Sequence, residues 1–284
     1  MLTVVLGLSG ALIYGASDFF GGLAAKRAPA LRVTLVAFVA ALVAVVAVLP
    51  FSGSVWSASA VGYGLAAGVA GAGALFLLYA CLSIGPMSIL SPLTALVSAI
   101  VPVGVGLLLG ERLGVAGWVA IAVALVAVAL VGIQPGAASA RPSVLALLMA
   151  VGSGILIGMH LILLHRTPPE SGMVPLVVDI SSGALVTALV MGSLALTRRT
   201  ATPRVPVRVG LGLGIWCGLT QGVANLLILS GLHLGDLTVM AVLNALYPAG
   251  TIVLAAVVLR ERITGLQGVG LALAIAAAAL FAVG

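Results

Sequence analysis

The sequence predicts an all-α membrane protein with ten transmembrane helices, arranged as two inverted five-helix repeats. Of its 284 residues, 63% are hydrophobic and only 6% are charged, against roughly 25% charged in an ordinary soluble domain. The hydrophobic residues form long runs of about 20, the length of a helix that crosses a bilayer. A segment that ends in a Glu-Arg pair also recurs 150 positions later.

Charged residues, prolines and Gly/Ser clusters separate ten hydrophobic runs. We expect helices, because runs of about 20 residues satisfy their backbone hydrogen bonds internally, whereas barrel strands would be about ten residues long and alternate in polarity. No basic segment precedes the first run and no cleavage site interrupts it, so it is expected to be a retained span and not a signal peptide. In chain order the runs cover residues 3–25, 31–49, 59–82, 87–109, 113–132, 143–164, 174–196, 208–231, 237–259 and 263–283.

The internal repeat is clearest at the fourth and ninth runs. Residues 84–113 and 234–263 align without a gap and share nine identities in thirty. Apolar identities alone are weak, but charged residues are rare in this chain, so a shared Glu-Arg ending is informative. We therefore divide the chain into repeats of residues 1–134 and 141–284, and expect the Glu-Arg pairs to cap helix ends. The pairs are Glu111-Arg112 and Glu261-Arg262.

Small residues recur at every fourth position of the third and eighth runs, again 150 positions apart. Such a stripe forms a groove in which a neighbouring helix backbone approaches closely. The alternative is that glycine is simply abundant, with 37 in the chain. The expected packing positions are Ala60, Gly64, Gly68 and Ala72 in the third run and Gly210, Gly214, Gly218 and Gly222 in the eighth.

The odd number of spans in each repeat makes the second repeat enter the membrane from the opposite side, as in many transporters. Ten of the twelve Lys and Arg residues follow odd-numbered spans, which places those loops in the cytoplasm and both termini outside. The charges are too few and scattered for a nucleic-acid partner, despite a net charge of +6. Cys81 and Cys217 are isolated in apolar runs, so neither a disulfide nor a metal site is expected.

The segment from Tyr79 to Leu113, YACLSIGPMSILSPLTALVSAIVPVGVGLLLGERL, and its echo from Leu229 to Ile263, ending VVLRERI, resemble the EamA family of the drug/metabolite transporter superfamily. The resemblance covers the chain as two five-helix copies. Its most specific piece is the Gly-Glu-Arg ending, which departs in the second copy, where Arg260 replaces the glycine. The resemblance implies a ten-helix secondary carrier, commonly an exporter of amino acids, other metabolites or drugs, with a central cavity between its halves.

Polar side chains inside hydrocarbon are costly, and those that remain tend to face the bundle interior or a water-filled path. Asp18 follows Tyr14 and Ser17 in the first run, at a spacing that can set all three on one broad face. We expect neither Asp18 nor Asp179 to have a basic partner at comparable depth, because every Lys and Arg lies near a helix end. A poorly solvated Asp18 would take up a proton readily and exchange it for a cationic or amine substrate; the alternative is solvation by cytoplasmic water. For Asp179 we expect hydration or a partner on a neighbouring helix.

His160 in the sixth run aligns with Ser17 or Asp18 when Gly158 is matched to Gly15. Its imidazole suits proton transfer, and the alternative is a packing histidine.

Amide side chains occur near mid-depth in the eighth and ninth runs. Because amides both donate and accept hydrogen bonds, they suit zwitterions and polar metabolites. The alternative is hydrogen bonding between helices that only holds the bundle together. The candidates are Gln221, Asn225, Asn244 and Tyr247 in the second repeat and Tyr79, Thr94 and Ser98 in the first.

Pro92, Pro102 and Pro248 are expected to interrupt the fourth and ninth spans, since proline lacks an N–H group and clashes with the preceding turn. Such breaks hinge a gate or expose carbonyls to a substrate; static kinks are the alternative. The fifth and tenth runs are almost free of polar atoms, so we expect a scaffold, a lipid-facing surface or the interface of a homodimer.

The function expected is a secondary carrier in a bacterial inner or plasma membrane that exports small molecules such as amino acids or amines by alternating access. No GxxxxGK[ST] motif occurs, so the energy source is an ion gradient, with proton coupling one option, or the substrate gradient itself. No cofactor or metal is expected. A flippase for a lipid-linked or amphipathic molecule and a membrane scaffold or receptor remain alternatives. An enzyme is disfavoured, because HExxH and a pair of aspartates within one span are both missing.

Overall fold

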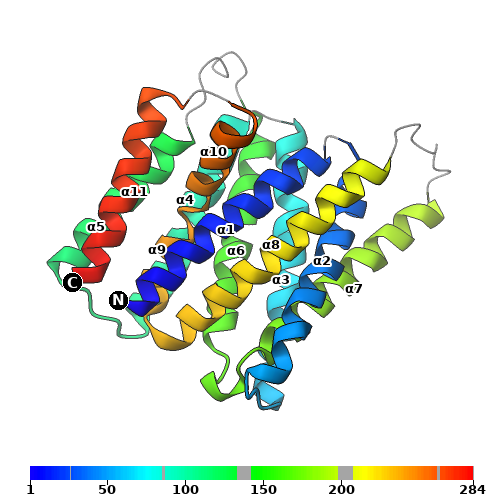
Figure 1. The fold of residues 1–284 in the computed structure, drawn as a ribbon, viewed down its shortest axis with the longest axis horizontal. Coiled ribbons are helices and arrows are strands. Elements are labelled where there is room, and N and C mark those ends of the chain that lie inside the picture. Colours follow the sequence, from blue (N-terminus) through cyan, green and yellow to red (C-terminus); the bar gives the residue numbers. More distant parts are fainter. Residues whose placement is uncertain (26, 85–86, 133–141, 198–206, 261–262, 284) are drawn as a thin grey trace.

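The structure is a computed structural model that describes residues 1–25, 27–84, 87–132, 142–197, 207–260 and 263–283. Every regular element in these ranges is helical, and the long helices run side by side as a bundle (Figure 1). They are α1 (Leu2–Ala25), α2 (Ala30–Val48), α3 (Ala58–Ile84), α4 (Met87–Leu108), α5 (Val115–Val131), α6 (Val144–His165), α7 (Val174–Thr197), α8 (Val207–Leu234), α9 (Leu237–Asn244), α10 (Tyr247–Val258) and α11 (Gly265–Val283).

Eight stretches in the described part of the chain are long and apolar enough to cross a membrane, and one of them, Leu237–Val258, contains both α9 and α10. Two shorter apolar helices, Pro92–Leu108 and Val115–Val131, accompany them. The chain is thus a multi-pass membrane protein. The helix positions follow the ten hydrophobic runs closely. Each run is apolar enough to stay in lipid, where its backbone N–H and C=O groups must bond to one another, and a helix satisfies them.

The break expected in both proline-containing spans occurs only in the ninth. There the helix stops at Asn244 and restarts at Tyr247, with Pro248 in the first turn of α10, where its missing N–H costs nothing. Helix α4 continues past both Pro92 and Pro102.

Helices of one repeat pack mainly on helices of the other. Helix α1 packs on α8 as α6 packs on α3, and α2 packs on α8 as α7 packs on α3. Helix α4 lies against α6 as α10 lies against α1, while α5 and α11 pair with each other at one edge (Figure 1). Each contact therefore has a counterpart in which the two repeats exchange roles, and neither repeat forms a core by itself.

The small-residue stripes lie where these backbones meet. A Cβ on Gly68 of α3 would collide with the backbone carbonyl of Asp179 in α7. A Cβ on Gly218 of α8 would collide with the carbonyl of Ala37 in α2. Only a hydrogen fits at either position, so glycine allows the close approach of both helix pairs. The other stripe glycines also face these neighbours: Gly64 contacts α7, Gly214 and Gly222 contact α2, and Gly210 contacts Ala28 just before α2.

The Gly-Glu-Arg ending joins the two repeats. Gly110 has φ +94°, and the N–H groups of Gly110 and Glu111 donate to the carbonyls of Leu107 and Gly106, both at 3.1 Å, which is the Schellman pattern of a helix end. The Glu111 carboxylate then accepts hydrogen bonds from the backbone N–H groups of Leu237 (2.8 Å) and Thr238 (3.0 Å). It thereby caps the start of α9 as a negative charge at a helix N-terminus. Glu261 and Arg262 lie outside the described residues.

At one end of the bundle, the lower end in Figure 1, helices α6 and α8 end and α7 and α9 begin. Large side chains of α6 to α9 are buried in one hydrophobic cluster there, and we call it the sealed end. Hydrogen bonds tie its connections together: the His165 imidazole donates from Nδ1 to the Leu232 carbonyl (3.0 Å), and Thr167 bonds His233 (2.9 Å). The cluster includes Leu164, Leu176, Leu229, Leu232, Leu237 and Met240.

Candidate functional site

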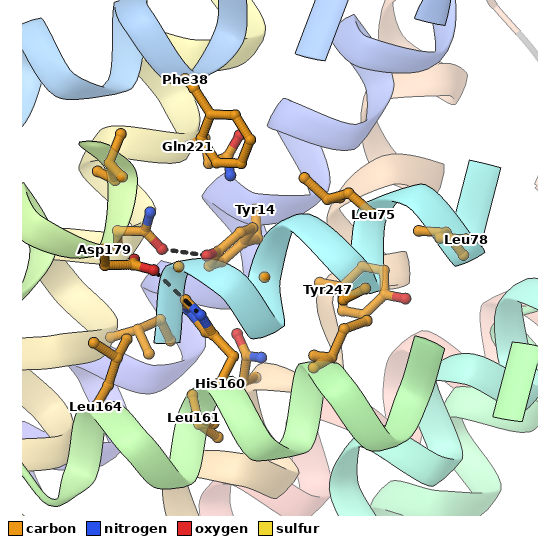
Figure 2. Close-up of a pocket in the computed structure, with 18 of the residues that line it drawn as sticks. Tyr14, Phe38, Leu75, Leu78, His160, Leu161, Leu164, Asp179, Gln221 and Tyr247 are labelled. Carbon is orange, nitrogen blue, oxygen red and sulfur yellow. Dashed lines mark hydrogen bonds and ion pairs between the residues drawn. The ribbon is translucent and has the colours of Figure 1, made fainter. Parts of the chain in front are cut away.

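A central cavity lies between the two repeats, and Leu161 and Leu164 of the sealed-end cluster line it (Figure 2). Its volume is about 110 Å³, and its walls come from α1, α2, α3 and α6 to α10. None of its described lining residues belongs to α5 or α11, which were expected to stand apart as scaffold. Seven residues singled out from the sequence line it: Tyr14, Asp18, His160, Gln221, Asn225, Asn244 and Tyr247.

Three other candidates bond to backbone carbonyls and lie outside the central cavity. Ser17 donates to the Cys217 carbonyl of α8 at 3.0 Å. Thr94 donates to the carbonyls of Leu90 (3.0 Å) and Ala150 (3.2 Å), and Ser98 bonds within its own helix. Ser17 and Thr94 thus lie at contacts between helices, whereas Ser98 bonds only within α4. The Tyr79 side chain lies outside the described part of the structure, and Pro92, Pro102 and Pro248 do not line the cavity.

The side chain of Asp18 lies at the junction of two cavities. It lines the central cavity and also a second, adjoining cavity bounded by Thr34 and Ala37 of α2 and Cys217 of α8. Its side chain is exposed, and no hydrogen bond or ion pair links it to another described residue. A carboxylate in this position is available to a positively charged molecule that enters the cavity.

Asp179 has a basic partner, contrary to our expectation from the sequence. Its Oδ1 lies 3.5 Å from Nδ1 of His160, and both side chains point into the cavity (Figure 2). The carboxylate is almost fully buried between α3, α6 and α7. The expectation failed because only Lys and Arg were considered as partners. A histidine at comparable depth in the preceding span was the signal that could have revealed the pair.

The cavity also holds a set of polar groups from different helices. The Tyr14 hydroxyl of α1 donates to Oδ1 of Asn225 in α8. Gln221 lies one turn before Asn225 and lines the same wall. Oδ1 of Asn244, at the end of α9, is buried and has no hydrogen-bond donor among the described residues. An unsatisfied buried acceptor costs about 1–3 kcal/mol, so this carbonyl is suited to a donor on a bound molecule.

Two hydrogen bonds occupy matching places in the repeats. The Nδ1–H of His160 donates to the Ala67 carbonyl at 3.0 Å, and Ser17 donates to the Cys217 carbonyl at the same distance. Ala67 and Cys217 are 150 positions apart, the offset of the repeat. His160 therefore stands at the place of Ser17, one of the two alignments expected from Gly15 and Gly158.

The partner of His160 is matched in the same way. The Asp179 carbonyl faces Gly68, and the Ala37 carbonyl faces Gly218, the corresponding glycine. Asp179 therefore stands at the place of Ala37. The ionisable pair belongs to the second repeat only, and Asp18 gives the first repeat its own carboxylate.

The lining is largely apolar, and its polar groups are carboxylates, amides, tyrosine hydroxyls and the imidazole of His160. No Lys or Arg is among the described residues that line the cavity, whereas two carboxylates and the rings of Tyr14, Phe38 and Tyr247 are. Aromatic faces and carboxylates both attract cations. In the described ranges, no group of three His, Cys, Asp or Glu residues is arranged to hold a metal ion.

Comparison with known proteins supports the same architecture. The sequence profile of the EamA-like transporter family matches residues 1–133 and 141–283. No curated protein matches the chain. A solved structure titled only "Crystal structure of protein" is similar over 99% of this chain and 96% of that chain, with a TM-score of 0.76 and 19% sequence identity. At this identity the similarity concerns the fold alone.

Proposed function

The chain belongs to the EamA-like transporter family, and from this premise we propose that it is a secondary carrier that exports small amines or amino acids by alternating access. The observation that carries the substrate class is the unpaired carboxylate of Asp18, exposed to a cavity that no described Lys or Arg lines. An ammonium group is the natural counter-ion of such a carboxylate, and it would also gain from the neighbouring aromatic faces. The apolar part of the cavity wall accommodates the hydrocarbon part of the molecule.

The proposed topology has ten crossings. The eight candidate spans supply eight of them, and the shorter helices α4 and α5 supply the other two. The Lys and Arg distribution supports a topology with both termini outside, and the proposed location is a bacterial inner or plasma membrane. The sealed end then faces the exterior, and the adjoining cavity beside Asp18 leads toward the cytoplasm. In this conformation the carrier is ready to accept a cytoplasmic substrate.

To complete the transport cycle, the sealed end would open and the end that is now open would close. The repeats have equivalent packing with exchanged roles, so the alternative conformation can be built from the same contacts. The break between α9 and α10, next to the cavity, gives the second repeat a hinge that α4 lacks. The energy source is an ion gradient or the substrate gradient.

Uptake into proteoliposomes tests the substrate class. The probes are labelled amino acids and primary amines, each compared with the carboxylic acid that lacks the amino group. We expect amines to be taken up and the matched acids to be excluded. Asp18→Asn should lower amine uptake by about tenfold or more, because a charge-assisted contact contributes on the order of 1.5–3 kcal/mol.

Asp236→Asn is the matched control, since this exposed aspartate precedes α9 and its side chain makes no capping hydrogen bond. Its uptake should equal that of the unmodified protein. Preference for the acids, or full activity of Asp18→Asn, would contradict the proposal.

One observation favours a flippase as the second candidate. An apolar cavity between α2, α3 and α7 shares Thr34 and Leu75 with the cavity beside Asp18, and so leads sideways from the centre. Such a path suits an amphipathic molecule whose tail stays in lipid. Movement of a fluorescent amine-headed lipid between leaflets, without release of soluble amine into the lumen, would select this function over export.

A further inference from the structure

We propose that the His160–Asp179 pair carries the proton that drives transport, while Asp18 holds the substrate. This inference rests on the proposed carrier function and adds the coupling ion and the groups that bind it. The two tasks are separated between the repeats, because the pair occurs only in the second and Asp18 only in the first.

The geometry fixes which nitrogen of His160 takes up the proton. Nδ1 lies 3.0 Å from the Ala67 carbonyl oxygen, which can only accept a hydrogen bond. Nδ1 therefore carries a hydrogen, and the Asp179 carboxylate lies on the same side at 3.5 Å. Nε2 makes no hydrogen bond to any described residue, and the ring lines the cavity. The neutral ring thus presents the lone pair of Nε2 as its proton acceptor.

Protonation then requires no rearrangement of the site. A hydronium ion in the cavity gives its proton to Nε2, so an N–H bond forms as an O–H bond breaks and a water molecule remains. The resulting imidazolium keeps Nδ1 beside the Asp179 carboxylate, at 3.5 Å from Oδ1.

The groups around the pair allow it to sense the substrate. The described side chains of α3 contribute no titratable group to this part of the cavity, since Gly68 and Gly71 face Asp179 and His160. Helix α1 contributes Tyr14 and Asp18, α8 contributes amides, and α10 contributes Tyr247. Because no fixed cation lines the described cavity, a bound ammonium at Asp18 would be the positive charge that competes with a proton at His160. Proton and amine therefore exclude each other electrostatically, which is the requirement for antiport.

The position of the pair links it to the change of conformation. His160 precedes Leu161, and Asp179 precedes Ile180, and both of these apolar residues belong to the cluster of the sealed end. The proton carrier thus lies where the cavity meets the sealed end. Opening that end would bring Nε2 into contact with the opposite solution, where the proton is exchanged.

Two measurements on the same proteoliposomes separate coupling from transport. Exchange of labelled amine against unlabelled amine at equal pH reports binding and conformational change. Accumulation of amine driven by a pH gradient reports coupling. We compare His160→Gln and Asp179→Asn with His165→Gln, the matched control, whose Nδ1 also donates to a backbone carbonyl at 3.0 Å but is paired with no carboxylate.

We expect His160→Gln and Asp179→Asn to retain exchange within about twofold and to lose gradient-driven accumulation by about tenfold or more, which corresponds to about 1.4 kcal/mol or more of lost coupling free energy. His165→Gln should retain both. In detergent, amine addition should release fewer protons from His160→Gln than from the unmodified protein.

Three results would overturn the proposal. Gradient-driven accumulation that persists in His160→Gln and Asp179→Asn would show that the proton is carried elsewhere. Loss of both accumulation and exchange in these variants would assign the pair to binding or folding. Equal proton release from His160→Gln and the unmodified protein would exclude Nε2. Failure of the proposed function gives a different result, since the unmodified protein would then exchange no amine at all.

Discussion

The two repeats place a hydrogen bond to an equivalent backbone carbonyl at the same point of the bundle, but they use different chemistry there. Ser17 in the first repeat makes a neutral contact, whereas His160 in the second brings an ionisable ring and its partner Asp179. The backbone packing is preserved between the repeats because both depend on glycine at the same stripe positions. The scaffold is therefore symmetric and the cavity chemistry is not, and the proposed division of proton and substrate binding between the repeats rests on this difference.

A second pair of equivalent positions teaches the same lesson. Thr94 is fully buried and donates to two carbonyls, so it joins α4 to α6. Asn244, 150 positions later, ends α9 at the cavity with its carbonyl oxygen unsatisfied. The first-repeat residue completes a helix contact, and the second-repeat residue leaves an acceptor for a ligand.

The largest loss of stability is expected at the close helix contacts that the two repeats share. Gly68→Ala and Gly218→Ala each drive a Cβ into a backbone carbonyl that cannot move independently. Each should lower the free energy of unfolding by about 2 kcal/mol or more, as overpacking does, measured by thermal unfolding in detergent. Gly62→Ala and Gly212→Ala are matched controls, also 150 apart, because a Cβ at either position meets nothing within 4 Å. Equal behaviour of all four variants would refute the packing role of the stripes.

A smaller effect is expected at the contact that joins the repeats. Glu111→Ala leaves the N–H groups of Leu237 and Thr238 without their acceptor, and Leu237 is completely buried. Stability should fall by about 1–2 kcal/mol, the usual cost of a lost helix cap. Glu111→Gln, which keeps one amide oxygen as acceptor, should recover part of this loss in the same unfolding assay. A Glu111→Ala protein as stable as the unmodified one would remove the capping role.

Ser17→Ala tests whether the first-repeat hydrogen bond is only a packing contact. The substitution removes the bond to the Cys217 carbonyl and leaves a buried carbonyl without that donor. A loss of about 1 kcal/mol in unfolding free energy is expected. A much larger loss would indicate that Ser17 also orders the Asp18 region.

The smallest effect, and a gain, is expected at the end of α10. Arg260 has φ +55° where the first repeat has Gly110 at φ +94°, so a residue with a side chain is held in the left-handed region. Arg260→Gly should raise stability by about 0.5–1 kcal/mol, the strain relieved less the added freedom of the unfolded chain. Gly110→Ala should have the opposite sign. A destabilised Arg260→Gly protein would show that the arginine side chain makes contacts that outweigh the strain.

Most of the fold followed from the sequence, and the site followed only in part. The ten hydrophobic runs located the helices, and the Glu-Arg repeat exposed the relation between the halves. Seven of the eleven residues expected to bind or couple line one cavity, because polar groups at mid-depth have few other places to go. The serine and threonine candidates do not line this cavity, because a hydroxyl in a helix can donate its hydrogen bond to a nearby backbone carbonyl.

By itself, the sequence determined that the chain lies in a lipid bilayer, where its helices are and that it contains a repeat. The length of the hydrophobic runs and the offset of 150 residues are properties of the chain alone. It could not determine that His160 and Asp179 meet, because their distance depends on how α6 and α7 pack on α3. Nor could it determine that α4 continues while the ninth span breaks, since both contain proline and neighbouring helices decide the outcome. The free carboxylate of Asp18 is likewise a tertiary property, because solvation and pairing inside a bundle are set by residues far away in the chain.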